Sequence, residues 1–99
     1  MRLREIAATR SGDKGDVSNI CVFVYDVSDW SLLVERLTAQ RVAEHFADVV
    51  AGPVERHVVP TLHGLNFVLY RALSGGVSMS LRVDPHGKSY QSHLLSIEL

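Results

Sequence analysis

The chain has 99 residues, of which 46% are hydrophobic and 21% charged, a composition typical of a folded globular protein and not of a disordered tail. Ten Lys and Arg against eleven Asp and Glu give a formal net charge of -1, which excludes the strongly basic surface of a general nucleic-acid binder. The single cysteine cannot form an internal disulfide, and the apolar runs are too short to span a bilayer. We therefore expect one cytoplasmic domain over residues 1–99, without a targeting or membrane segment.

The first quarter of the chain predicts two strands joined by a charged loop. Leu3 to Thr9 alternates weakly, whereas Val17 to Tyr25 contains an unbroken apolar run, Ile20 to Tyr25, typical of a central strand covered on both faces. Residues Arg10 to Asp16, R-S-G-D-K-G-D, lie between them. We expect a β-hairpin with a long glycine-bearing tip, and Cys21 as a small core residue.

Two helical segments are expected next. Ser28 or Asp29 can cap a helix whose apolar residues recur at helical spacing from Trp30 to Leu37. Thr38 can cap a second helix, or a bent continuation of the first, whose apolar stripe runs from Val42 to Val50.

A strand and a third helix follow. Gly52-Pro53 ends the second helical pattern, and Val54 to Val59 is a strand candidate. Thr61 can then cap a helix over residues 65–73, in which Leu65, Val68, Leu69, Ala72 and Leu73 form one apolar stripe. A second stripe, part polar and part aromatic, is covered either by the other helices or by a partner: it contains His63, Asn66, Phe67, Tyr70 and Ser74.

The last quarter predicts a second β-hairpin. Val77 to Val83 alternates apolar and polar residues, Asp84 to Gly87 matches a type I turn, and His93 to Leu99 alternates again. A helix from Ser89 onward is the alternative for the second arm. The order β-β-α-α-β-α-β-β indicates an α+β fold, a ferredoxin-like sandwich with a mostly antiparallel sheet and helices on one face.

The segment from Arg10 to Asp16 is the best candidate for a site. Its glycines allow backbone amides to turn toward one spot, where Arg10 and Lys14 could neutralise an anion. A solvated hairpin tip explains the same residues, so both interpretations stay open. The spacing excludes a phosphate-binding P-loop and an EF-hand, and the histidines show no metal-ligand spacing. We expect neither a metal nor a cofactor.

Candidate catalytic groups are few. His57 and His63, which flank the Pro60–Thr61 junction, could transfer a proton near neutral pH, and Asp13 or Asp16 could serve as an acid or base. A histidine at the start of a helix equally suits a capping or surface role.

These residues resemble the C-terminal domain of the AtuA (acyclic terpene utilisation) family. The resemblance rests on R-S-G-D-K-G-D at 10–16 with S-N-I at 18–20, L-N-F-V-L at 65–69, G-G-V at 75–77 and S-L-R at 80–82. It covers nearly the whole chain and implies a ferredoxin-like fold in a short, stand-alone protein.

The resemblance also implies a setting in the acyl-CoA catabolism of terpenoid or branched-chain acids, with no assigned catalytic residue. It suggests an accessory subunit that pairs with a large AtuA-type protein or with itself, and that could meet a CoA thioester. A stand-alone acyl-CoA hydratase or lyase, and a sensor of CoA or another anion, are the alternatives. The positions that would bind an anion or ligand are Arg10, Ser11, Gly12, Lys14, Gly15, Asn19, Asn66 and Arg82.

Three positions depart from the family pattern that the resemblance implies. Glycine is expected in place of Cys21, asparagine in place of Thr61, and alanine in place of Gly64.

Overall fold

The computed structural model describes residues 1–14, 17–47, 50, 52–71 and 89–99, and for residues 13, 14 and 89–91 the backbone alone. Along the chain these residues form two strands, two helices, two strands and a last helix: β1 (Ala7–Lys14), β2 (Val17–Val24), α1 (Trp30–Arg36), α2 (Ala39–His45), β3 (Val54–Val59), β4 (Gly64–Tyr70) and α3 (Ser89–Leu94). Short 3-10 turns lie at Leu3–Glu5, Val27–Asp29 and Pro60–Leu62.

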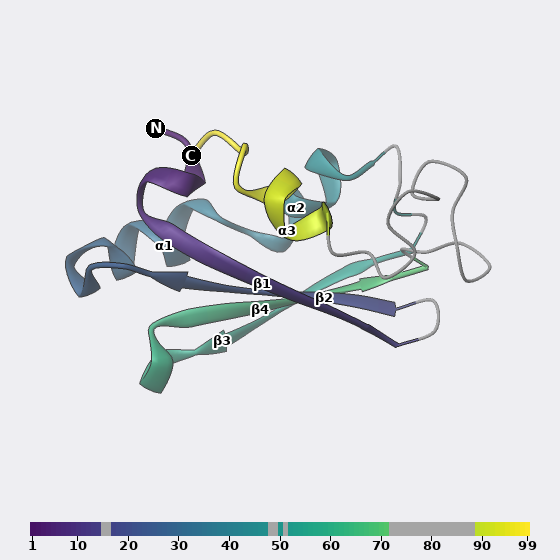
Figure 1. Ribbon diagram of the computed structural model, residues 1–99, viewed down its shortest axis with the longest axis horizontal. Helices are drawn as coiled ribbons and strands as arrows, with labels where there is room; N and C mark the ends of the chain where they lie inside the picture. Colours follow the sequence, from purple (N-terminus) through teal and green to yellow (C-terminus); the bar gives the residue numbers. More distant parts are fainter. Residues whose placement is uncertain (15–16, 48–49, 51, 72–88) are drawn as a thin grey trace.

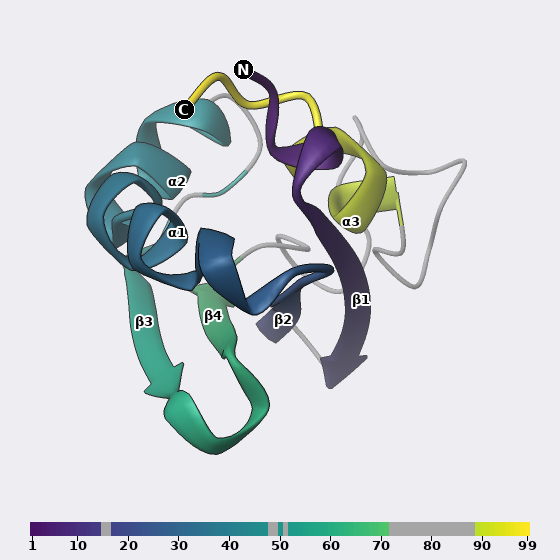
Figure 2. The ribbon, with the colours of Figure 1, turned by 90° about the vertical axis from the view of Figure 1, so that its left-hand side faces the viewer.

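The four strands form one antiparallel sheet in the order β1-β2-β4-β3. The three helices lie on one side of this sheet (Figure 1), with α2 against β3 and α3 against β1. The end-on view in Figure 2 shows the same separation into a helical layer and a sheet layer. An α+β fold with an antiparallel sheet and helices on one face is thus confirmed.

The core fills the space between the sheet and the helices. Because side chains alternate along a strand, every second residue of β2 and β4 faces the helical layer. These residues are buried, as are the apolar residues that the helices turn toward them: Ile20, Val22, Leu65, Phe67 and Leu69 on the sheet, and Leu33, Leu37, Val42, Phe46 and Leu94 on the helical side. Trp30 packs partly buried at the start of α1.

The prediction for the first strand and its loop was wrong in its boundaries. Leu3 to Glu5 forms a 3-10 turn that buries Leu3, and β1 runs on to Lys14, pairing Arg10 with Cys21 and Lys14 with Val17. The predicted loop is therefore strand over residues 10–14. Polar residues are tolerated there because β1 is the outer strand of the described sheet, and no described element covers the face that carries Arg10.

The third predicted helix is strand β4. Leu65, Phe67 and Leu69 are buried, whereas Asn66 and Val68 are half-exposed, which is a period of two. Leu65 and Leu69 satisfy the helical and the strand period equally. The strand forms because β2 and β3 supply hydrogen-bonding partners on both sides, and because Phe67 and Val68 favour extended backbone.

The two threonines predicted as caps have different roles. The Thr38 hydroxyl oxygen accepts a hydrogen bond from the backbone N–H of Arg41 at 3.2 Å, so this N-cap is confirmed. Thr61 lies in a 3-10 turn between β3 and β4, where His63 adopts a left-handed conformation with φ of 49°. Of the two expected caps of α1, Asp29 occupies the N-cap position but its side chain makes no capping hydrogen bond. Asp26 caps the preceding 3-10 turn by accepting a hydrogen bond from the Ser28 backbone N–H, which lowers the pKa of the Asp26 carboxyl.

The second predicted hairpin is wrong in its second arm. Its first arm and turn, residues 77–87, lie outside the described residues. Residues 93–99 do not form a strand, and the helix weighed as the alternative is present as α3, which ends at the buried Leu94. Ile97 is buried in the turn that follows, and the chain then makes a bridge from Glu98 to Arg2. The spacing of three between Leu94 and Ile97 suits a helical turn that packs on the core.

A histidine stack joins α3 to α2. The rings of His45 and His93 have centroids 4.5 Å apart with 26° between their planes, and the Phe46 ring lies 5.2 Å from His93. Burial against these rings, followed by the proximity of His45, lowers the pKa of His93 below its ordinary value of 6.5.

This stack predicts a loss of stability in mild acid. Below about pH 6.5, His93 is protonated in the unfolded chain but still largely neutral in the folded chain, where its pKa is lower. The free energy of unfolding should therefore fall as the pH drops from about 6.5 toward this lowered pKa. Thermal melts at about pH 7.5 and about pH 5.5 should show a smaller decrease in Tm for His93→Gln than for the unmodified chain. The exposed His57→Gln serves as the control, and an equal decrease in all three proteins would contradict this role.

Candidate functional site

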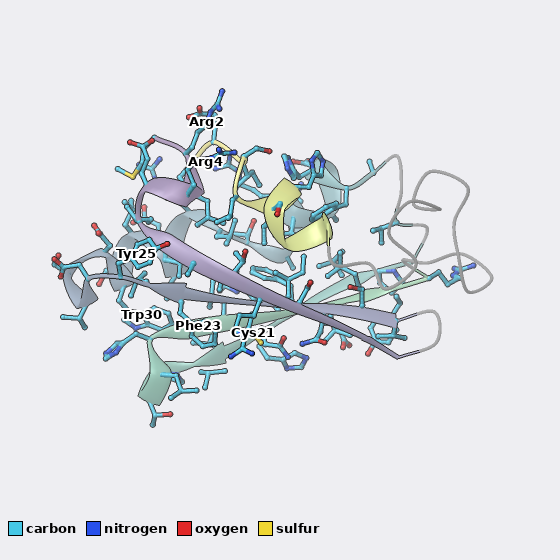
Figure 3. All side chains as sticks on the ribbon, viewed as in Figure 1. Arg2, Arg4, Cys21, Phe23, Tyr25 and Trp30 are labelled. Atoms are coloured by element: carbon cyan, nitrogen blue, oxygen red, sulfur yellow. The ribbon has the colours of Figure 1, made fainter. Side chains whose placement is uncertain are left out.

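The side of the sheet opposite to the helices is the candidate site. Directly paired residues in an antiparallel sheet lie on the same face, so the register arranges this surface in rows that cross β1, β2, β4 and β3 in turn. The central row is Arg10, Cys21, Asn66 and His57, flanked by Gly12, Asn19, Val68 and Glu55 on one side and by Ala8, Phe23, Gly64 and Val59 on the other. We call these twelve residues the open face, because no element within the described part of the chain covers them. Figure 3 shows the labelled Cys21 and Phe23 on this side.

Two asparagines and the cysteine form a hydrogen-bonded group at the centre of the open face. The side-chain N–H of Asn19 donates to the Asn66 carboxamide oxygen at 3.3 Å, and the Cys21 thiol donates to the same oxygen at 3.4 Å. All three side chains are half-buried. Because both donors engage the oxygen, the Asn66 NH2 group is left to donate to another acceptor. Among the described residues, the hydrogen bonds of the Asn66 side chain both go to its oxygen, so the NH2 group can serve a bound molecule.

Gly12 makes room for this group. A Cβ atom at position 12 would lie 3.1 Å from the Asn19 side-chain oxygen, closer than side chains normally approach. Gly12 was expected in a turn, but it lies within β1, opposite Asn19. Its function is to keep the surface beside Asn19 free of a side chain.

The β3 edge of the open face carries a carboxylate. The Tyr70 hydroxyl donates to Glu55 Oε1 at 2.8 Å, and His57 Nε2 lies 3.7 Å from the same oxygen. The hydrogen bond to Glu55 raises the pKa of Tyr70. On the opposite edge, β1 presents the exposed Arg10. The open face is therefore positive along β1 and negative along β3.

Four of the predicted ligand-binding residues come together on the open face: Arg10, Gly12, Asn19 and Asn66. Ser11, half-buried, lies on the helical side, since it pairs with the buried Ile20. Lys14 is the last residue of β1. Gly15, Asp16 and Arg82 lie outside the described residues. The expected cluster of turning amides is not present over residues 10–14, whose backbone pairs with β2.

The candidate catalytic residues Asp13 and His63 lie at opposite ends of the sheet. Asp13 pairs with Ser18 near the start of β2, whereas His63 precedes Gly64, which pairs with Phe23 near the end of β2. His63 is exposed and packs edge-on against Trp30, with ring centroids 5.8 Å apart. The structure does not bring these two groups into one site.

Several residues of the open face were missed. Cys21 was assigned to the core, but it is half-buried beside Asn66, and the described elements cover β2 on one face only. Glu55 and His57 were not proposed as ligands. Alternation along β2 links Cys21 to Asn19, but their proximity to His57 depends on the strand order, which no local pattern contains.

Within the described residues, no group of three His, Cys, Asp or Glu side chains could hold a metal ion. No helix there is long and apolar enough to cross a bilayer.

The family model described as the AtuA ferredoxin-like domain matches residues 1–99. The chain belongs to the AtuA ferredoxin-like domain family. Searches of curated proteins and of solved structures gave no match. Of the three departures from the pattern that the AtuA resemblance implies, Cys21 and Gly64 both lie on the open face of this AtuA domain, whereas Thr61 lies in the turn before β4. One departure from the pattern that the AtuA resemblance implies, Cys21, is therefore a member of the hydrogen-bonded group with Asn19 and Asn66.

Proposed function

We propose that this AtuA domain is a cytoplasmic interaction subunit that binds a protein partner through its open face and serves the catabolism of terpenoid or branched-chain acyl-CoA thioesters. Membership of the AtuA family supports the acyl-CoA setting. The observation that carries the interaction role is a sheet face that no described element covers, with apolar side chains around a fixed polar centre.

The chemistry of this face suits a protein interface. Phe23, Val59 and Val68 present half-buried apolar surface that would gain about 25 cal/mol for each Å² removed from water. The Asn19–Asn66 pair lies among them and offers an NH2 group whose direction is already set. Interfaces combine such apolar surface with a few placed hydrogen-bonding groups and a charged rim, here Arg10 and Glu55.

Two partners fit the proposal: a large AtuA-type subunit and a second copy of this chain. Both would cover the open face and leave the helical layer exposed to solvent.

Substitution of Val68 by lysine tests the role. Val68→Lys places a charge at the centre of the open face, where a partner would have to desolvate it, so we expect co-purification with a large AtuA-type subunit, or self-association, to be lost. Gln40→Lys, on the exposed side of α2, is the matched control and should bind as the unmodified chain does. Undiminished binding by a folded Val68→Lys variant would contradict the proposal, and circular dichroism verifies the folding.

An anion sensor is the second candidate. The exposed Arg10 shares a row with Asn66, so a carboxylate or phosphate could bind to the guanidinium and the amide together. Calorimetry with a CoA thioester distinguishes this role, since heat of binding by the isolated chain would favour the sensor. A stand-alone hydratase or lyase has less support because Asp13 and His63 are far apart along the sheet.

A further inference from the structure

We infer that the open face binds a second copy of this chain, with the two sheets packed face to face across a two-fold axis that runs parallel to the strands. This inference rests on the proposed interaction role and names the partner. The argument comes from the distribution of charge and of side-chain size over the four strands.

The charges select one of two aligned arrangements. Packed sheets keep their strands within about 30° of each other, so a two-fold axis in the interface runs either along the strands or across them. An axis across the strands places β1 on β1 and brings Arg10 near Arg10 of the second copy. An axis along the strands places β1 opposite β3, so Arg10 lies across from His57 of the second copy. Glu55 of the second copy is two residues along the same strand, within reach of the long Arg10 side chain. Opposite charges favour the second arrangement.

The side-chain sizes fit the same arrangement. With the axis between β2 and β4, each row of the open face packs against the same row of the second copy, which runs in the opposite order across the strands. Gly12, at the β1 end of its row, therefore lies opposite Glu55, at the β3 end of that row in the second copy. The missing side chain at Gly12 leaves space for that carboxylate beside Arg10 on the same strand.

Phe23 fills the centre of the row that it forms with Ala8, Gly64 and Val59. A Cβ atom at Gly64 would lie 2.7 Å from the Phe23 ring, which shows that the ring lies over Gly64, between β2 and β4. The axis passes through this position, so the Phe23 rings of the two copies would stack on it. Two flat rings fill the roughly 10 Å between packed sheets.

The area of the face indicates a weak dimer. Four strands spaced about 4.8 Å apart and about seven residues long, at about 3.4 Å per residue, cover about 450 Å² on each copy. The roughly 900 Å² buried in total is in the range of transient complexes, so we expect a micromolar Kd that rises with salt.

A charge swap tests the arrangement. Arg10→Glu and Glu55→Arg should each raise the dimer Kd at least about tenfold, measured by sedimentation equilibrium at low salt, because each places like charges opposite one another. The double variant, Arg10→Glu with Glu55→Arg, should return the Kd to within about threefold of the original. Arg4→Glu and Glu35→Arg make the same charge changes at exposed positions away from the open face and should leave the Kd unchanged.

The thiol gives a second measurement. Cys21 is the single cysteine and belongs to the open face, so its reaction rate with a disulfide reagent should fall as the protein concentration passes through the Kd. A rate independent of concentration would overturn the inference, as would a chain that stays monomeric at several hundred micromolar, or a double variant that shows no recovery.

These outcomes separate the inference from the role on which it rests. A monomeric chain that loses a large AtuA-type subunit upon Val68→Lys would overturn the second copy as partner and leave the interaction role intact. A dimer unaffected by Val68→Lys would contradict both.

Discussion

Replacement of Phe67 by alanine should lower the free energy of unfolding by about 3–5 kcal/mol, a large part of the stability of a domain of this size. Phe67 lies at the middle of β4, is fully buried, and pairs with Ile20 on β2 and Arg56 on β3. Truncation would leave a cavity between the sheet and the helices, and the strands on both sides prevent the backbone from closing it. Urea unfolding followed by circular dichroism measures the loss.

Val68→Ala is the matched control, because it truncates the next residue of the same strand. Val68 lies on the open face, so its loss should cost less than about 1 kcal/mol. In a helix over residues 65–73 the order would be reversed, since Val68 would lie in the core stripe and Phe67 beside it. Equal effects, or a larger effect at Val68, would contradict the strand.

Arg56→Met should lower the free energy of unfolding by about 2–3 kcal/mol, because it leaves two partly buried carbonyl groups without their charged donor. The half-buried Arg56 guanidinium of β3 donates to the carbonyl oxygens of Val34 at 2.7 Å and Leu37 at 2.9 Å. These carbonyls lie at the C-terminal end of α1, where the helix dipole is negative and a cation is favourable. Urea unfolding again provides the measurement.

Two further substitutions serve as comparisons for Arg56→Met. Arg56→Lys keeps the charge but not the planar pair of donors, so its effect should lie between those of Arg56→Met and the unmodified chain. Arg4→Met, at an exposed position, should change stability by less than about 0.5 kcal/mol. If Arg56→Met were as mild as Arg4→Met, the hydrogen bonds to α1 would not contribute to stability.

The elements that the sequence predicts well are those whose signals are local. Val54 to Val59 forms β3 with the expected bounds, and the Thr38 cap places the start of α2 correctly, because turn residues and a capping hydroxyl act within a few positions. The long apolar run in β2 gives a central strand for the same reason.

β4 and α3 could not be predicted because their local patterns are ambiguous. Leu65 and Leu69 fit both a helix and a strand. Apolar and polar residues alternate after His93 as they would in a strand, although the segment includes the end of helix α3, where Leu94 is buried. The pairing with β2 and β3 decides that residues 64–70 form a strand and not a helix, and β2 is distant in the sequence.

The candidate site was predicted in part. The AtuA resemblance singled out Arg10, Gly12, Asn19 and Asn66, and the structure brings these four together. It could not indicate that they meet on a sheet face instead of a loop, since that depends on the register of β1. The participation of Cys21 and His57 follows from the strand order alone.

The contact between Phe23 and Gly64 has an evolutionary consequence. A methyl group at position 64 would collide with the Phe23 ring at 2.7 Å and with the backbone oxygen of Val22 at 3.0 Å. Homologues that carry the alanine expected at position 64 must therefore place a smaller or differently turned side chain at position 23. These two positions should covary across the family, and a lineage that changes one first would pass through a less stable intermediate.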